Sequence, residues 1–235
     1  MFGRKNKGDN SNDQAGQVEQ AGQAQQSQAE NDYGPFDGDT VDFREFDFSD
    51  FASGALDLGS MLVPVPHGGE VKVEMGPDGP QMIHLEIDGG RITPIAFAAP
   101  RNGDLWAEAV DDTVAGMTKD GLEVHLEDGP WGQEICAVAG EGQMRLIGVN
   151  GPRWMFRVTL AGEKSKADEL AKIGREIVAR TFIRRGNDPI PAGQPLPVLM
   201  PQAMAEALQE QLQQLSHRQY DAPQGGTQAS GGEQQ

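Results

Sequence analysis

The sequence has a single cysteine, Cys136, among its 235 residues. One thiol excludes an internal disulfide and a zinc site built from several cysteines. Long apolar runs are also missing: the segment Ile95–Ala99 is far shorter than the roughly 20 residues that span a membrane. No apolar stretch follows the basic residues near the N-terminus, as it would in a signal peptide. We therefore expect a cytoplasmic protein without a membrane segment.

Basic residues are scarce as well. Lys and Arg total 19, Asp and Glu total 36, and the formal net charge is −17. On this balance we expect no direct binding to duplex DNA, because neutralising phosphates requires clusters of Lys and Arg. Aromatic residues make up only 6%, but Val, Ile, Leu and Met are dense in the middle of the chain. This composition favours one soluble domain flanked by tails.

Composition divides the chain into six segments. Residues 1–32 and 217–235 are rich in Gln, Gly and Ser, which predicts disordered tails of low complexity. Between these tails we expect, in chain order, an acidic aromatic arm (33–58), a core domain (59–185), a Pro-rich arm (186–200) and an amphipathic helix (201–216).

The core domain has the pattern of an α+β fold. Apolar residues alternate with polar ones in segments that predict strands at 61–65, 71–75, 81–88, 91–99, 123–127, 133–139, 143–149 and 153–160. Spacings of three and four predict helices over about 105–117, capped by Asn102 or Asp104, and about 166–184, with a capping box at Ser165. Short hairpins favour antiparallel pairing. We expect a β-rich two-layer domain with both helices on one face, in which two diverged strands-then-helix repeats are an open alternative.

Aromatic residues of the arm alternate with acids: eight acids and one base, Arg44, lie between Asp32 and Asp57. This pattern has two interpretations. The arm could dock into a basic, apolar groove of a partner, or its phenylalanines could pack onto the following domain. So much apolar surface is unfavourable in water, which favours the second interpretation. The candidate interaction residues of the arm are Phe43, Phe46 and Phe48.

A second candidate surface is a group of arginines. Arg145, Arg153 and Arg157 could form a positive strip over a sheet, because Trp154, Phe156, Val158 and Leu160 of the last strand are predicted to point inward and Arg153 and Arg157 outward. Such a strip could hold an anion, a nucleic-acid backbone or an acidic partner. The alternative is that these arginines pair with the chain's own acids, which the net charge favours.

The C-terminal segments could also bind a partner. Five prolines make residues 186–201 extended, either as an arm across the domain surface or as a partner-binding strip. The helix that follows has an apolar stripe containing Leu208 and Leu212. This stripe is too short for a coiled coil and must dock in cis or on a partner, and homo-oligomerisation stays open.

Catalytic motifs do not occur. The histidines His67, His84, His125 and His217 lack metal-ligand spacing to one another or to Cys136. The sequence contains no nucleophile elbow, no P-loop and no H-E-x-x-H. We predict no catalytic residue, no cofactor and no metal ligand.

Several segments are similar to a known family. The motifs "RLIGVNGPRWMFR" and "DGPWGQEI", and the segment "IVARTFIRRGNDPIPAGQPLPVLMP", resemble an actinobacterial family of uncharacterised proteins, domain of unknown function 3710, over residues 36–200. The resemblance implies no assigned activity. Family members are often encoded near a deoxyuridine triphosphatase and a small OB-fold protein, which hints at nucleic-acid metabolism.

The leading hypothesis is a non-enzymatic protein-interaction or adaptor module. The alternative is an accessory factor in nucleic-acid or nucleotide metabolism that uses the basic strip around Arg153.

Overall fold

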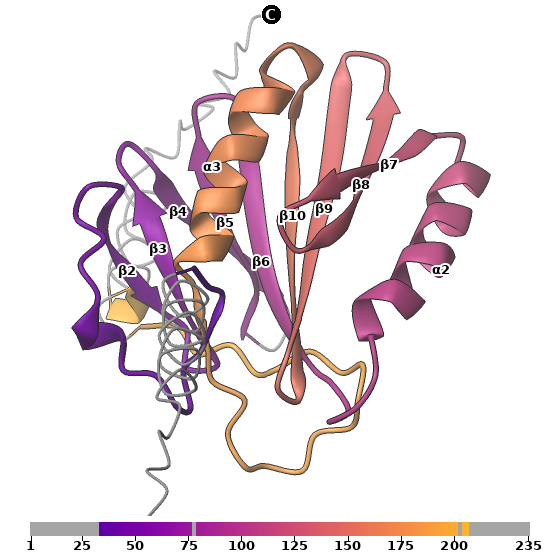
Figure 1. Cartoon of the computed structure of the whole chain (residues 1–235). Helices are drawn as coiled ribbons and strands as arrows, with labels where there is room; N and C mark the ends of the chain where they lie inside the picture. The colour runs from indigo at the N-terminus through magenta and orange to yellow at the C-terminus, as the bar shows by residue number, and fades with distance from the viewer. Residues whose placement is uncertain (1–32, 77–78, 202–203, 207–235) are drawn as a thin grey trace, which may run out of the picture. The chain divides into compact units, whose positions relative to one another are not determined.

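The computed structural model describes residues 33–76, 79–201 and 204–206. The chain forms two compact units, residues 1–199 and 200–235, and only the first is described at length. The predicted tails at 1–32 and 217–235 lie outside the described residues, as do Leu208 and Leu212 of the predicted C-terminal helix. In the second unit, residues 204–206 are helical. The first unit is an α+β fold rich in antiparallel strands, as the sequence predicts (Figure 1).

Most of the predicted strands form one large antiparallel sheet. In the described residues its seven strands follow the order β4-β5-β6-β10-β9-β8-β7. The predicted strands from residue 71 to residue 160 are confirmed, with small shifts at their ends. The strands of this sheet are β4 (Glu70–Gly76), β5 (Gly79–Ile87), β6 (Gly90–Ala98), β7 (Glu123–Gly129), β8 (Gly132–Ala139), β9 (Gly142–Gly151) and β10 (Trp154–Glu163).

A smaller sheet joins the arm to the rest of the domain. Its order is β1-β11-β3-β2, with β1 (Phe36–Asp37), β2 (Ala52–Asp57), β3 (Met61–Pro66) and β11 (Phe182–Ile183). β1 and β11 are parallel, and the other neighbours are antiparallel. Segments from the start and the end of the domain therefore meet in one sheet, which short-range sequence patterns do not reveal.

The two long helices lie on opposite faces of the large sheet. On β10 the inward-pointing Trp154, Phe156, Val158 and Leu160 are at most 2% exposed, as predicted. α3 (Ala167–Ala179) packs on this face, where Gly174 lies against Leu160. α2 (Leu105–Lys119) packs on the other face, where Trp106 covers Gly148, the partner of Arg157 in the β9–β10 ladder. The prediction that both helices share one face is wrong, because the face of Met155 and Leu146 is also apolar and buried.

The helix ends are set by local hydrogen bonds. The carboxylate of Asp104 accepts a hydrogen bond from the backbone N–H of Ala107 at 2.8 Å, so the predicted cap of α2 is confirmed. α3 is shorter than predicted. Its capping box does not form, because the Ser165 hydroxyl donates to Glu163, and the chain leaves the helix after Ala179 to place Phe182 in β11. No helix of the described residues is long and apolar enough to cross a membrane.

The Pro-rich arm runs along β6. The β5–β6 ladder ends at Leu85 and Ile92, just before Pro94. Beyond this point Ala98 donates its N–H to the carbonyl of Gln194 at 2.9 Å, and Leu196 donates to Ala96 at 2.8 Å. Leu196 is 3% exposed. The arm thus crosses the domain surface, which is the first of the two alternatives that its sequence allows. It forms hydrogen bonds with the part of the β6 edge that β5 does not pair with.

Candidate functional site

The outer face of the small sheet provides the floor of an aromatic pocket. Phe182 is the register partner of both Phe36 on β1 and Leu62 on β3, and these three side chains form a buried cluster. Met61 and Val63 alternate with Leu62 along β3, so they point to the inner face, where they are fully buried. Both faces of the small sheet are therefore apolar, and the outer face, with Phe36, Leu62 and Phe182, must be shielded from water by another segment.

The aromatic arm supplies this cover. The ring of Phe46 lies 4.6 Å from that of Phe36 and 5.4 Å from that of Phe182, measured between centroids, and 5.7 Å from that of Phe48. Such tilted and edge-on pairs are favourable geometries for aromatic rings. These contacts support the interpretation in which the arm packs onto its own domain.

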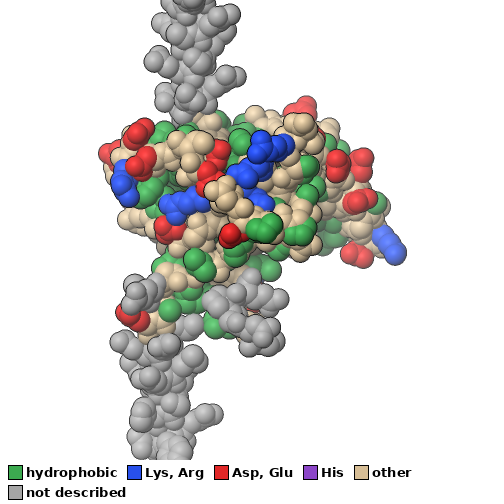
Figure 2. Space-filling view, turned by 90° about the horizontal axis from the view of Figure 1, so that it is seen from below, with side chains coloured by type: hydrophobic (Ala, Val, Ile, Leu, Met, Phe, Trp, Pro, Cys, Tyr) green, Lys and Arg blue, Asp and Glu red, His purple; other side chains and the backbone are tan. Residues whose placement is uncertain are grey.

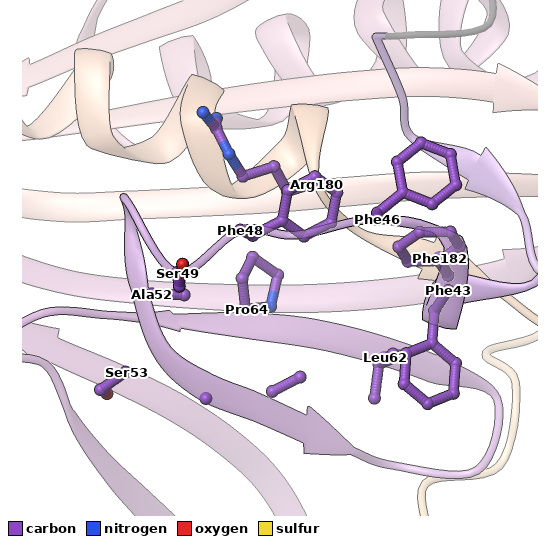
Figure 3. Close-up of a pocket in the computed structure, with 12 residues that line it drawn as sticks. Phe43, Phe46, Phe48, Ser49, Ala52, Ser53, Leu62, Pro64, Arg180 and Phe182 are labelled. Atoms are coloured by element: carbon purple, nitrogen blue, oxygen red, sulfur yellow. The ribbon is translucent and has the colours of Figure 1, made fainter.

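The cover is incomplete and leaves an open pocket of about 270 Å³. Figure 3 shows the rings of Phe43, Phe46 and Phe182 at one end of this pocket and Ser49, Ala52 and Ser53 at the other. Phe43 keeps 38% of its surface exposed. The pocket, called the aromatic pocket below, is lined by Phe43, Phe46, Phe48, Ser49, Ala52, Ser53, Gly54, Ala55, Leu62, Pro64, Arg180 and Phe182.

Strand β2 forms one wall of the aromatic pocket. It lies at the end of the small sheet, and no other described strand pairs with its outer edge. Ser53, Gly54 and Ala55 are exposed along it, and their small side chains leave the backbone accessible. A register shift between Ala52 and Gly54 marks a bulge, after which the pairing with β3 is regular through Asp57. An exposed edge of this kind can pair with another chain.

Two arginines contact the aromatic rings of the arm, but only Arg180 lines the pocket. The guanidinium of Arg180 lies 4.9 Å from the centroid of the Phe51 ring and 5.7 Å from that of Phe48, and it is paired with Asp50 and Glu176. Arg184 lies over Phe43 and is paired with Asp57 at 2.9 Å. Cation–π contacts of this type stabilise by about 0.5–1 kcal/mol each at exposed sites.

The arm carries two exposed acids next to the pocket-lining Phe46 in the sequence. Glu45 and Asp47 have no cationic partner among the described residues, and both belong to the arm that frames the pocket. The backbone N–H of Ser49 donates to the carboxylate of Asp47, which lowers the pKa of Asp47 below its ordinary value. Asp47 is therefore ionised at neutral pH.

The three arginines of the predicted strip lie on separate surfaces. Arg145 is 5% exposed on the α3 face of the sheet and is ion-paired with Glu134 and Glu127, both at 2.7 Å. Arg157 lies on the α2 face over the ring of Phe97, where burial lowers its pKa. The strands explain this separation: Arg145 is the register partner of Leu160, not of Arg157, so the two arginines point in opposite directions.

Arg153 lies in the turn before β10, at a left-handed φ of 62°. Its Nη2 donates to the carbonyl of Gly186 at 3.2 Å. It lines a shallow polar pocket of about 450 Å³ with Arg101, Asn102, Pro152 and Asn187. Figure 2 shows Lys and Arg side chains near the centre of the face seen from below. Among the described residues, the lining of this pocket includes two arginines and no acid.

A third group brings together His125, Glu127 and Cys136. One potential ligand atom from each lies within 4.8 Å of the others. Sequence spacing conceals this group, because His125 and Cys136 are eleven residues apart. The hairpin register makes them direct partners. Alternation on both strands, joined at Gly129-Pro130-Trp131-Gly132, is the signal that could have revealed it. Burial raises the pKa of the Cys136 thiol to about 11, so the free thiol is neutral and a poor nucleophile at neutral pH.

Comparisons with solved structures give distant likenesses. One is a crystal structure from Bacteroides thetaiotaomicron VPI-5482, with 14% identity and a TM-score of 0.39, covering 72% of this chain. This chain spans 62% of that protein's length. Another is the solution structure of cyanobacterial PsbP (CyanoP) from Synechocystis sp. PCC 6803, with 9% identity, a TM-score of 0.36, and coverage of 53% of this chain and 86% of that one. These scores carry no functional argument.

Comparison with families is more informative. No curated protein matches the sequence. The model of the family described as "Protein of unknown function (DUF3710)" matches residues 34–207, which includes the aromatic arm, both sheets and the Pro-rich arm. Because this match spans well over half of the chain, the chain belongs to the DUF3710 family.

Proposed function

We propose that this protein is a non-enzymatic interaction module whose aromatic pocket binds a short, extended segment of a partner protein. The single observation that supports this proposal is the aromatic pocket itself: exposed apolar rings open to solvent directly beside an unpaired strand edge. Rings exposed in a concave site are typical of peptide anchors, because burying them on binding is favourable.

The size of the pocket favours a side chain over a metabolite. Small-molecule sites usually enclose about 300–1,000 Å³. The aromatic pocket, at about 270 Å³, is smaller. A large apolar side chain fits this space, with its ring or branched end against Phe43 and Phe182.

Strand β2 gives the partner a place for its backbone. In β-strand addition an extended peptide pairs with an exposed edge, and pockets beside that edge select the side chains. The bulge near Ser53 confines regular pairing to Gly54–Asp57. This length admits a short peptide of a few residues, with its apolar side chain directed to the pocket side of the sheet.

The acids of the arm specify the partner further. Glu45 and Asp47 lack cationic partners in the described part of the chain, and the whole chain has a net charge of −17. A peptide that carries Lys or Arg beside its apolar anchor is therefore preferred, since opposite charges steer and orient binding. We place this binding in the cytoplasm, which the composition favours.

A peptide selection tests the proposal. Phage-displayed random peptides would be selected on the full chain and counter-selected on the variant Ala55→Arg. Ala55 is exposed and lines the pocket, so arginine there fills the pocket and adds a positive charge without entering the core. We expect enriched peptides with an aromatic or aliphatic residue next to Lys or Arg. Failure to enrich any peptide that prefers the wild type over this variant contradicts the proposal.

A second candidate function rests on the polar pocket at Arg153. Two arginines and two asparagines without an acid suit a phosphate group, which fits an accessory factor in nucleic-acid or nucleotide metabolism. Fluorescence anisotropy with a labelled nucleoside triphosphate and a labelled single-stranded oligonucleotide tests this candidate. Binding that is weakened by Arg101→Gln supports it, and absence of binding at micromolar protein excludes it.

A further inference from the structure

His125, Glu127 and Cys136 share one face of the β7–β8 hairpin. His125 and Cys136 are register partners, so their side chains project side by side from neighbouring strands. Glu127 follows His125 by two residues and therefore points to the same face. One ligand atom from each residue lies within 4.8 Å of the others. Three different donor atoms, a nitrogen, an oxygen and a sulfur, thus converge on one point.

The separations are close to those of a tetrahedral metal shell. The distance from His125 Nε2 to Glu127 Oε1 is 3.0 Å. In a tetrahedral zinc site, nitrogen and oxygen ligands at about 2.0–2.1 Å from the metal lie about 3.4 Å apart. Sulfur at about 2.3 Å from the metal lies about 3.6 Å from the nitrogen, so from a separation of at most 4.8 Å the thiol must approach by at most about 1.2 Å. Rotation of the exposed His125 ring and of the Glu127 side chain supplies this movement.

The surroundings hold the carboxylate in place. Arg145 Nη2 donates to Oε2 of Glu127 at 2.7 Å, which leaves Oε1 directed at His125. Carboxylates that bind metals are typically fixed in this way by a neighbouring hydrogen-bond donor. The side chains of His125 and Glu127 are 52% and 42% exposed, so an ion can reach them from solvent, whereas Cys136 beside His125 is fully buried.

We propose that His125, Glu127 and Cys136 form a site for a single divalent cation of the zinc type, with a solvent molecule in the fourth position. A ligand set of thiolate, imidazole and carboxylate suits zinc rather than magnesium or calcium, which prefer all-oxygen sites. Three protein ligands and one open position are the arrangement of zinc sites that exchange a ligand.

Metal binding changes the charge of the cluster by only one unit. The Cys136 thiol loses its proton to solvent and becomes the thiolate ligand, while the imidazole stays neutral. Glu127, Glu134 and the thiolate then contribute three negative charges, opposed by Arg145, Arg175 and a divalent ion. The cluster therefore changes from neutral to a net charge of +1, in a protein whose formal charge is −17.

Metal titration of the full chain tests this proposal. After removal of metals by chelation, Zn²⁺ would be titrated calorimetrically and Co²⁺ by absorption, into the wild type, His125→Gln, Cys136→Ser and the control His67→Gln. His67 is an exposed histidine in another part of the domain, where its ring contacts the carbonyl of Ser49. We expect one ion per chain, unchanged affinity in His67→Gln, and a loss of at least about tenfold in His125→Gln. A thiolate-to-cobalt charge-transfer band should be present in the wild type and absent from Cys136→Ser.

Two results would overturn the proposal: wild type that binds no stoichiometric Zn²⁺ at micromolar concentration, or His125→Gln that binds it as tightly as wild type. Because Cys136 is buried, a loss of metal binding in Cys136→Ser counts only if the circular dichroism spectrum shows that this variant is folded. His125→Gln changes an exposed ring and leaves the core intact, so it decides the question even where Cys136→Ser unfolds.

Discussion

Gly148 lies directly beneath the indole ring of Trp106, so that a Cβ added to Gly148 would lie 2.0 Å from Cδ2 of that ring. This contact brings α2 onto β9. Trp106 is 4% exposed, and its Nε1–H donates to the carbonyl of Gln133 at 2.8 Å, which fixes the ring. The ring therefore cannot move aside without losing a buried hydrogen bond.

Replacing Gly148 by alanine should destabilise the domain. We expect Gly148→Ala to lower the free energy of unfolding by about 1–3 kcal/mol, the usual cost of overpacking. Gly116→Ala, in the same helix–sheet unit, is the control: a Cβ there meets nothing within 4 Å, and alanine in a helix gains about 0.5–1 kcal/mol over glycine. Urea unfolding of both variants checks these opposite signs, and the same sign in both would contradict this packing of α2.

Glu134 is the centre of a buried ion-pair network. It is 1% exposed and accepts hydrogen bonds from Arg145 at 2.7 Å and from Arg175 Nε at 2.9 Å. Removing one partner of a buried pair leaves an uncompensated charge, so Glu134→Ala should cost about 3–5 kcal/mol. Glu123→Ala, at an exposed position of β7, is the control and should change stability by less than about 0.5 kcal/mol. Equal denaturation midpoints for the two variants would show that Glu134 is not paired in solution.

Trp154 tests the register of β10. It is 1% exposed and points to the α3 face with Phe156 and Val158. Trp154→Ala should cost about 3–5 kcal/mol, as for other large aromatic residues removed from a core. Thermal unfolding monitored by circular dichroism measures the loss. A melting temperature within one degree or so of wild type would mean that the other face of this strand is the one in the core.

Periodicity predicted the strands and helices well, because buried faces impose their spacing on the sequence. The strand register of Trp154 and the cap at Asp104 both follow from such local rules. The faces that the helices cover could not be predicted in this way, since both faces of the large sheet carry buried apolar side chains, Leu160 on one and Met155 and Leu146 on the other. Ion pairing of Arg145 with the chain's own acids was favoured by the net charge, but its partners could not be named from the sequence, because only the pairing of β7, β8 and β9 brings Glu127 and Glu134 to it.

The candidate sites, too, could be predicted only where they depend on local sequence patterns. Packing of the aromatic arm onto its own domain was predictable, because its phenylalanines are too apolar to stay in water. The aromatic pocket was not, because a pocket is a gap between Phe43, Pro64 and β2 that depends on tertiary geometry. His125 and Cys136 could have been paired from the hairpin register alone.

Duplex DNA should not bind. Acids outnumber bases by 36 to 19, and Arg145 and Arg184 are already neutralised by carboxylates. We expect no anisotropy change with a labelled duplex at physiological salt and micromolar protein, because non-specific binding requires clustered Lys and Arg. A salt-dependent rise in anisotropy would instead support the polar pocket around Arg153 as a nucleic-acid site.

The most direct test of the aromatic pocket is calorimetry with a peptide selected on it. Phe43→Ala and Leu126→Ala remove side chains of similar exposure, 38% and 41%, but only Phe43 lines the pocket. We predict that Phe43→Ala weakens peptide binding at least tenfold, which corresponds to about 1.4 kcal/mol, and that Leu126→Ala leaves the dissociation constant unchanged. Equal affinities for wild type and Phe43→Ala would contradict binding at this pocket.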